Sequence, residues 1–292
     1  MTEKHLDFTV IVPCFNEEQA IRETVLEIAE QLSTQATTRL IVVDDGSKDG
    51  SRALLADLVQ EVAQLHVVEH ERNLGYGAAL KSGIARAGTD LIVITDADGS
   101  YPIDQIPVLA RACADADMVV GARTGPQVTY SKVRSIPKSF LRLWVSWIAR
   151  QSVPDINSGM RAFQKSAVER YLRILPDTFS FTTTLTLAML TDFRRVKFMP
   201  INYTERVGQS KIQPVRDTLR FMTLILRTGM YFAPMRALAP VVGVLGLITF
   251  GSLCYDVWLG NLTDKSVMLA MFTLNMGIFA LLADMIDKRS GR

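Results

Sequence analysis

The chain has 292 residues, of which 48% are hydrophobic, and its formal net charge at pH 7 is only +2. The length suits one large domain with an appendage, and the weak net charge disfavours nucleic acid as a partner. Three cysteines without metal-like spacing disfavour a disulfide framework. No signal peptide precedes the first apolar run, so we expect the N-terminal domain to stay in the compartment where it is made.

The first 125 residues alternate between short apolar runs and segments of helical periodicity. Strands are predicted at residues 8–12, 40–43, 65–69, 91–95 and 118–121, and helices at 17–32, 51–64, 76–87 and 103–114. Continuous apolar strands separated by helices predict an α/β, Rossmann-like domain whose mostly parallel sheet is covered on both faces. Ligands of such sheets bind at the carboxyl ends of the strands.

Acidic residues follow three of these strands, and the third group is the most informative. Asp96 and Asp98 lie one residue apart at the end of the apolar run 91–95. Two carboxylates placed where a buried strand ends form a compact site of hard oxygen ligands. Such a site suits Mg²⁺ or Mn²⁺ bound to a diphosphate. We therefore predict that these two side chains hold a divalent ion.

Two segments combine basic and apolar side chains. In residues 125–152, basic residues alternate with Trp144, Trp147 and aliphatic side chains. This segment is either a surface helix packed on the domain or an interfacial helix with tryptophan and basic residues at the lipid headgroups. In residues 215–231, arginines recur at helical spacing, which predicts an amphipathic helix beside a membrane.

Two long apolar segments, 237–259 and 267–286, follow. Each reaches the roughly 20 residues that cross a hydrocarbon core of about 30 Å, so we predict a transmembrane hairpin. A pair of buried core helices is the alternative, which would need a large additional protein surface. Basic residues gather outside the hairpin, at Arg227, Arg236, Lys288, Arg289 and Arg292, whereas its connecting loop has Lys265. The positive-inside rule therefore places both ends and the N-terminal domain in the cytosol.

The predicted organisation has three parts. A domain of residues 1–214 is followed by an amphipathic interface helix at 215–235 and by the hairpin region at 236–292. Within the domain, residues 125–152 are expected to form an interfacial segment on the side where an acceptor substrate from the membrane would bind.

Six motifs occur along the chain in a consistent order. They are Val12–Glu18, Val42–Ser51, Asn73–Gly77, Asp96–Pro102, Asn157–Phe163 and Glu205–Lys211. The first four resemble family 2 glycosyltransferases of the GT-A fold. The last two are similar to the polyprenyl-phosphate sugar transferases, which include dolichol-phosphate mannose synthases and bactoprenol glucosyltransferases. The resemblance covers most of residues 8–230. The Gln-x-x-Arg-Trp signature of processive members is absent, which disfavours polymer synthesis.

The resemblance implies an inverting, metal-dependent transfer of a sugar from a UDP- or GDP-sugar to a dolichyl or undecaprenyl monophosphate. The reaction is expected at the cytosolic face of a membrane, with a bacterial or archaeal plasma membrane favoured over the endoplasmic reticulum. Two alternatives stay open. One is transfer to a lipid hydroxyl or a lipid-linked glycan, and the other is a non-catalytic nucleotide-binding scaffold in the membrane. The donor sugar, its base, the prenyl length and a homo-oligomeric state are undetermined.

The resemblance also implies roles for individual residues. Those expected at the donor nucleotide are Pro13, Phe15, Glu17, Asp45, Gly75, Asp96 and Ala97. For Asp45, a role in stabilising the turn before Gly46 is the alternative. Asp96 and Asp98 would hold Mg²⁺ or Mn²⁺, and Ser100 is a weak third candidate because mannose synthases carry glutamine at that position. Asp98 and Arg206 are expected to be catalytic.

The acceptor phosphate calls for cationic side chains. A phosphate monoester is largely ionised near neutral pH, so its transfer needs charge more than a general base. Forked guanidinium donors suit such a group. The candidates are Arg123, Arg134, Lys138, Arg206 and Lys211, with solvated surface charge as the alternative. Arg161 is expected to shape either the donor or the acceptor pocket.

Overall fold

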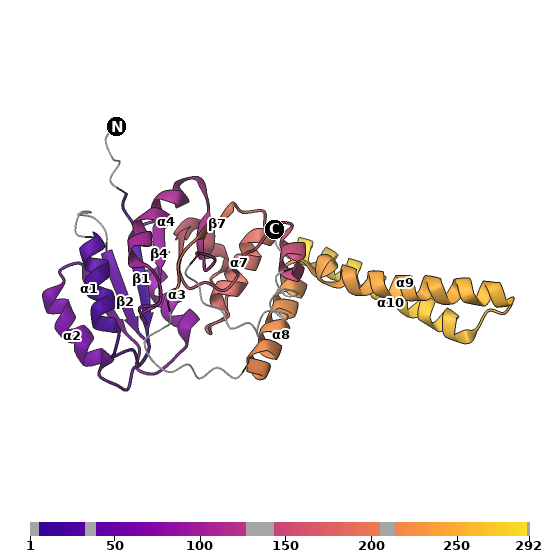
Figure 1. Ribbon diagram of the computed structural model, residues 1–292, viewed down its shortest axis with the longest axis horizontal. Coiled ribbons are helices and arrows are strands. Elements are labelled where there is room, and N and C mark those ends of the chain that lie inside the picture. Colours follow the sequence, from indigo (N-terminus) through magenta and orange to yellow (C-terminus); the bar gives the residue numbers. More distant parts are fainter. Residues whose placement is uncertain (1–5, 33–38, 127–142, 205–213, 291–292) are drawn as a thin grey trace.

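The computed structural model describes residues 6–32, 39–126, 143–204 and 214–290, of which 214–222 and 287–290 are described by their backbone. An α/β domain is followed by a single long helix and by a helical hairpin that projects away from the domain as an arm (Figure 1).

A seven-stranded sheet forms the centre of the domain, in the order β3-β2-β1-β4-β6-β5-β7. The strands are β1 (Thr9–Cys14), β2 (Arg39–Asp44), β3 (Leu65–Glu69), β4 (Leu91–Ile94), β5 (Met118–Ala122), β6 (Arg161–Gln164) and β7 (Val196–Pro200). All neighbours pair in parallel except β6, which runs antiparallel between β4 and β5. The predicted α/β class and mostly parallel sheet are confirmed. The strands β6 and β7 are additions that the apolar runs did not predict.

Helices cover both faces of the sheet (Figure 1). On one face lie α1 (Ile21–Leu32), α2 (Ser51–Glu61) and α4 (Ile106–Ala112), and on the other lie α3 (Tyr76–Arg86) and α7 (Phe181–Thr191). Val10 and Val12 of β1 belong to the hydrophobic core on the side of α1, α2 and α4, whereas Ile11 belongs to the core on the side of α3 and α7. This burial on two sides explains why the strands read as continuous apolar runs.

Short helical segments complete the domain. They are η1 (Ile103–Gln105), η2 (Cys113–Asp115), α6 (Lys165–Val168) and η4 (Glu169–Tyr171). The single helix predicted at 103–114 is therefore wrong in detail, because 3₁₀ turns replace both of its ends. Pro107 in the first turn of α4 lacks a backbone N–H, which suits the start of an α-helix.

The direction of strand addition reverses between β1 and β4. From β1 the sheet grows through β2 to β3, and β4 is then added on the opposite side of β1. Open α/β sheets bind ligands at such a switch point, beyond the carboxyl ends of the strands. The turn that carries Asp96 and Asp98 follows β4 at this point.

Three helices form the C-terminal region: α8 (Pro214–Phe232), α9 (Pro234–Leu259) and α10 (Asp264–Ser290). The helix predicted at 215–231 is confirmed. Both α9 and α10 are long and apolar enough to cross a membrane, and most of their surface is exposed. They are candidate transmembrane helices, in agreement with the predicted spans 237–259 and 267–286. Their orientation and the predicted domain boundaries stay predictions.

Polar contacts link the hairpin internally and to the domain. The hydroxyls of Thr249 and Thr273 lie 2.8 Å apart between α9 and α10. Of the predicted interfacial segment, residues 143–149 are helical. There Trp147 Nε1 donates to the carbonyl of Arg236 at 3.2 Å, and Arg236 Nη1 donates to the carbonyl of Ile148 at 2.9 Å. These bonds fasten the domain to the start of α9.

Close packing of α3 on β1 gives a test of the fold. A Cβ on Gly83 would lie 2.5 Å from Cγ2 of the fully buried Ile11. Overpacking costs about 1–3 kcal/mol, more than the gain of at most about 1 kcal/mol from placing alanine in a helix. We expect Gly83→Ala to lower the thermal unfolding temperature of the purified protein by several degrees.

The matched control is Gly88→Ala, whose Cβ would meet only a side-chain atom of Arg39, at 3.6 Å. Equal unfolding temperatures for the two variants would contradict the described packing.

Candidate active site

The two carboxylates predicted to hold a metal are fixed by different neighbours. Asp98 is 8% exposed, and its Oδ1 accepts hydrogen bonds from Ser100 N at 3.1 Å and Ser100 Oγ at 2.5 Å. Asp96 Oδ1 accepts a hydrogen bond from Tyr76 Oη at 2.9 Å. Ser100 therefore orients Asp98, and its predicted role as a third metal ligand stays a prediction.

The surroundings of Asp96 disfavour its negative charge. Burial and then the charge of Asp98 raise the pKa of Asp96 to about 6. The hydrogen bond from Tyr76 and the charges of Arg123 and Arg161 oppose this rise without cancelling it. The backbone also presses close, because a Cβ on Gly159 would lie 2.5 Å from Asp96 Oδ2. A bound cation would remove this electrostatic penalty.

The donor set fits a hard divalent ion that is shared with a substrate. The described residues contain no group of three or more His, Cys, Asp or Glu side chains that could hold a metal. An ion on Asp96 and Asp98 would therefore complete its oxygen coordination with water or with a diphosphate. The carboxylate chemistry agrees with the prediction of Mg²⁺ or Mn²⁺.

Asp96 contributes to the wall of a pocket of 280 Å³. Aromatic rings of Tyr76, Phe179, Tyr101 and Tyr203 form much of this wall. Tyr76 and Phe179 stack with centroids 5.3 Å apart, and Tyr101 meets Tyr203 edge to face at 5.1 Å. None of these four aromatic residues was singled out by its sequence pattern.

Arg123, predicted to bind the acceptor phosphate, lies in the wall of the same pocket directly after β5. Its Nε is 2.7 Å from Asp155 Oδ2, and its Nη2 is 2.9 Å from Asp155 Oδ1 and 2.7 Å from Asn157 Oδ1. Burial favours a high pKa for Asp155, but the hydrogen bonds and charge of Arg123 outweigh it and hold this pKa below its usual value. Asp155 and Asn157 therefore position Arg123 at the pocket, although no sequence motif marks Asp155.

The segment that follows β7 runs beside the Asp98 turn. Thr204 N donates to the carbonyl of Ser100 at 3.1 Å. The guanidinium of Arg123 lies over the Tyr203 ring, 5.3 Å from its centroid. Thr204 thus lies beside the turn that carries Asp98. Four predicted acceptor residues lie outside the described residues, and their roles stay predictions: Arg134, Lys138, Arg206 and Lys211.

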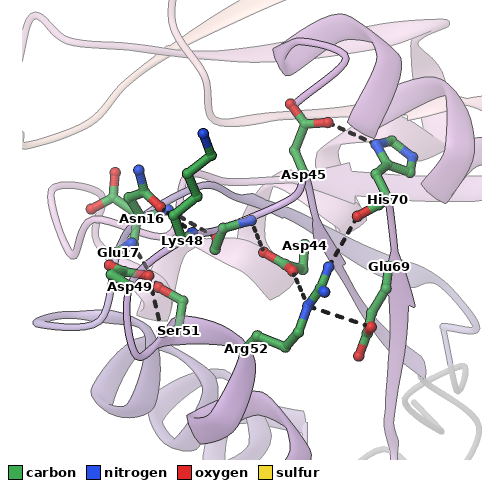
Figure 2. A network of polar contacts seen from close by, with 11 residues as sticks. Asn16, Glu17, Asp44, Asp45, Lys48, Asp49, Ser51, Arg52, Glu69 and His70 are labelled. Carbon is green, nitrogen blue, oxygen red and sulfur yellow. Dashed lines mark hydrogen bonds and ion pairs between the residues drawn. The ribbon is translucent and has the colours of Figure 1, made fainter. Parts of the chain in front are cut away.

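The turns after β1 and β2 form a single polar network (Figure 2). Asn16 N donates to Ser47 Oγ at 3.0 Å, and Lys48 N donates to Asn16 Oδ1 at 2.8 Å. Glu17 N donates to Ser51 Oγ at 2.9 Å. These bonds fix the two turns relative to each other at the carboxyl edge of the sheet, where the donor nucleotide is predicted to bind.

The other predicted donor residues differ in accessibility. Phe15 is exposed, whereas Pro13 is buried at the end of β1 and Ala97 is buried between the two carboxylates. The carbonyl of Ala97 accepts a hydrogen bond from Thr24 Oγ1 of α1 at 3.1 Å. This bond holds the turn that carries the carboxylates against α1. Their contacts with a nucleotide stay predictions.

Asp45 contacts His70 (Figure 2) and also holds the segment that leads into α3. Its carboxylate accepts hydrogen bonds from Leu74 N at 2.9 Å and Gly75 N at 2.8 Å, and His70 Nδ1 lies 2.7 Å away. The neighbouring Asp44 pairs with Arg52 Nε at 3.0 Å. A structural role for Asp45 is therefore visible, although it acts on residues 70–75 and not on its own turn. A contact with the nucleotide stays a prediction.

Two glycines at the start of α3, Gly75 and Gly77, allow the backbone of residues 176–177 to pack closely against the helix. A Cβ on Gly75, whose φ is +107°, would lie 2.2 Å from the carbonyl oxygen of Asp177. A Cβ on Gly77 would lie 2.2 Å from that of Pro176. The close neighbour is thus the 176–180 segment, which the sequence did not predict. The approach of a nucleotide to Gly75 stays a prediction.

Arg161 lies in the core and is not among the described residues that line the pocket. It is fully buried, donates from Nη1 to Thr182 O at 3.0 Å and to Thr186 Oγ1 at 2.9 Å, and donates from Nη2 to Ser158 O. Burial lowers its pKa to about 10. Arg161 therefore joins the loop before β6 to α7. The choice between a donor and an acceptor role stays open.

Comparison with known proteins identifies the family. The model of the family described as "Glycosyl transferase family 2" matches residues 9–172. This chain belongs to glycosyl transferase family 2. The predicted family and the prediction of a glycosyltransferase are confirmed.

Two curated relatives act on lipid carriers, according to their names. The polyprenol monophosphomannose synthase of Mycolicibacterium smegmatis is 30% identical over 217 residues, which are 70% of this chain and 80% of the relative. The undecaprenyl-phosphate 4-deoxy-4-formamido-L-arabinose transferase of Photorhabdus laumondii is 27% identical over 253 residues, or 83% of this chain and 73% of the relative. Both names agree with the predicted group of polyprenyl-phosphate sugar transferases.

A solved structure shares the fold. The glucosyl-3-phosphoglycerate synthase of Mycobacterium tuberculosis, solved with Mn²⁺, UDP and phosphoglyceric acid, has a TM-score of 0.57 at 18% identity and covers 76% of this chain and 78% of its own. The same enzyme has also been solved with Mg²⁺ and UDP. This similarity confirms the GT-A-like fold and shows that the fold accommodates a divalent metal.

The raised pKa of Asp96 predicts a pH-dependent penalty on stability. Its folded-state pKa of about 6 exceeds the ordinary value of 3.8. The stability that protonation supplies is therefore present below pH 4 and is lost as pH rises through about 6. We expect Asp96→Asn, with EDTA present, to raise the free energy of unfolding by about 1–3 kcal/mol at pH 7.5 and by much less at pH 4.5.

Thermal unfolding of the detergent-purified protein at both pH values measures this difference. Asp104→Asn, which replaces an exposed carboxylate, serves as the control and should change little. An Asp96→Asn protein that is less stable than wild type at pH 7.5 would contradict the assigned electrostatics.

Proposed function

We propose that this protein transfers a sugar from a nucleoside diphosphate sugar to a polyprenyl monophosphate, with inversion at the anomeric carbon. Family membership and the names of the two curated relatives support it. The observation that carries the proposal is one pocket that brings together Asp96, the positioned Arg123 and Leu224 of α8. It lies on the domain that α8 connects to the candidate membrane hairpin.

On the donor side, Asp96 and Asp98 would bind Mg²⁺ or Mn²⁺ together with the diphosphate of a UDP- or GDP-sugar. A bound ion there supplies charge that stabilises the departing nucleoside diphosphate. Tyr76 and Ser100 keep the two carboxylates in place for this task. The turns after β1 and β2 would receive the nucleoside at the switch point of the sheet.

On the acceptor side, a phosphate oxygen of the lipid attacks the anomeric carbon opposite the leaving diphosphate. One C–O bond forms as the other breaks, and no proton must be removed from a phosphate that is already ionised. Arg123 would hold this phosphate in line, supported by Arg134, Lys138, Arg206 and Lys211. A hydroxyl acceptor would require a carboxylate base. Among the described pocket residues the one carboxylate is Asp96, which is assigned to the metal. This favours a phosphate over a lipid hydroxyl.

The same arrangement supports a location at a membrane. The hairpin would anchor the protein, and the basic residues at its outer ends would keep the active site at the cytosolic face. A bacterial or archaeal plasma membrane is favoured.

The full-length protein in detergent tests the proposal when it is incubated with Mn²⁺, undecaprenyl phosphate and radiolabelled UDP-glucose, UDP-galactose or GDP-mannose. We expect chloroform-extractable label from at least one donor. Asp98→Asn should lower kcat at least about 100-fold, because it removes half of the charge that holds the ion.

Asp104→Asn should retain wild-type activity, and the unfolding temperature of each variant reports folding. The absence of lipid-linked label with every donor, or full activity in Asp98→Asn, would contradict the proposal. A product in which the sugar is linked to a lipid hydroxyl, identified by mass, would favour the alternative acceptor.

A further inference from the structure

The N-terminus of α7 forms part of the pocket wall that the proposed reaction leaves unassigned. This helix has 11 residues, and Ser180, Thr182 and Thr183 at its start line the pocket. Thr182 and Thr183 are only 3% and 1% exposed. Within the described part of the chain, neither hydroxyl makes a hydrogen bond. The small exposed part of each side chain therefore faces the pocket.

Two later threonines of α7 show the contrast. The hydroxyls of Thr186 and Thr191 each donate at 2.8 Å to the carbonyl four residues earlier, on Thr182 and Leu187. This is the usual way in which a helix accommodates a buried threonine hydroxyl. The buried hydroxyl of Thr184 also has no partner among the described residues, but Thr184 does not line the pocket. Position in the pocket wall therefore distinguishes Thr182 and Thr183. For Thr182 and Thr183 the equivalent carbonyls precede the helix, and neither receives such a bond.

The backbone at this helix end also has unused donors. The side chain of Ser180, at the N-cap position, makes no capping bond. The N–H groups of Thr182 and Thr183 find no acceptor among the described residues. Buried polar groups without partners cost about 1–3 kcal/mol each, and native structures leave few of them. A ligand with several hydroxyl groups would satisfy both the N–H groups and the threonine hydroxyls.

The charges of the pocket favour a neutral ligand. The N-terminus of a helix by itself attracts anions. In this pocket, however, Asp96 is present, and Arg123, the one cation among the described lining residues, is held by Asp155 and is assigned to the acceptor phosphate. No described cation of the pocket therefore remains for an acidic sugar. The ring of Phe179, 80% exposed, offers an apolar face beside the hydroxyls. An apolar surface with a few converging hydrogen-bonding groups is typical of small-molecule sites.

We propose that the N-terminus of α7 is the subsite for the transferred sugar, where Thr182 and Thr183 bind hydroxyls of a neutral sugar and so select the donor. The subsite presupposes the proposed function and specifies its substrate class. Its position beside Asp96 places the sugar next to the diphosphate that the carboxylates would hold.

The test begins with the full-length wild-type enzyme and undecaprenyl phosphate, using UDP-glucose, UDP-galactose, GDP-mannose and UDP-glucuronate as donors. A neutral sugar should be preferred. Thr182→Val and Thr183→Val, which keep the side-chain shape, should each lower kcat/KM for that donor about tenfold. The KM for undecaprenyl phosphate and inhibition by the free nucleoside diphosphate should stay unchanged. The matched control is Thr191→Val, which should behave as wild type.

Deoxy analogues of the preferred donor sugar identify which sugar hydroxyl Thr183 binds. With the wild-type enzyme, kcat/KM should be lower for the analogue that lacks the hydroxyl bound by Thr183 than for the complete donor. With Thr183→Val, kcat/KM should be the same for both donors, as expected for coupled partners. Thr183→Ser keeps the hydroxyl and should retain most activity. If the valine variant does not fold, Thr183→Ala removes the hydroxyl in its place, and Thr182→Val is the second probe.

Several results would overturn the subsite while leaving the proposed function intact. These are wild-type kinetics in Thr182→Val and Thr183→Val with every donor, an effect confined to the KM for undecaprenyl phosphate, equal losses in Thr183→Ser and Thr183→Val, or a preference for UDP-glucuronate. A wild-type enzyme that transfers no sugar from any donor would instead reject the proposed function and the subsite with it.

Discussion

The structure depends on placing two neighbouring carboxylates, the buried Asp98 and the half-buried Asp96, where β4 ends. Desolvation of Asp96 and then the charge of Asp98 raise the pKa of Asp96 to about 6. The chain nevertheless holds both groups in place, through Tyr76 on Asp96 and Ser100 on Asp98. An arrangement that is unfavourable for the protein alone becomes favourable when a cation binds. Stored strain of this kind is typical of functional sites.

The antiparallel strand β6 brings the rest of the site to these carboxylates. Because Ile94 of β4 pairs with Arg161 of β6, the residues just before Arg161 lie at the carboxyl end of β4. The loop 155–159 therefore reaches the pocket, where it supplies the partners of Arg123 and the close approach of Gly159 to Asp96. The buried Arg161 then ties this loop to α7. One reversed strand thus organises both proposed substrate subsites.

The local sequence pattern was sufficient to predict part of this arrangement. The apolar strands up to β5, the carboxylate pair after β4 and the long apolar helices α9 and α10 all follow from residue type and spacing over a few positions. The strand β6 could not be predicted in this way, because it is only four residues long and begins with Arg161. An arginine is usually exposed, and this one is buried only because of its three-dimensional surroundings. The two glycines at the start of α3 have a similar explanation. Their constraint is a carbonyl about one hundred residues later in the chain, which no local pattern records.

The same limit applies to the candidate site. Asp155 carries no motif, and its importance comes from its bidentate contact with Arg123. Thr182 and Thr183 carry no motif either, and only the structure shows that they line the pocket. Residues that work through long-range contacts therefore have to be found in three dimensions, whereas the two carboxylates proposed to bind the ion were recognisable from their spacing.

Binding of Mn²⁺ to the full-length protein in detergent, followed by electron paramagnetic resonance between pH 5 and 7.5, addresses the carboxylate pair most directly. We expect affinity to rise as pH passes through about 6, because Asp96 must lose its proton. Addition of UDP or GDP should tighten binding, and replacement of both carboxylates by asparagine should abolish it. Binding that is independent of pH, or that survives the double replacement, would contradict a metal site at the end of β4.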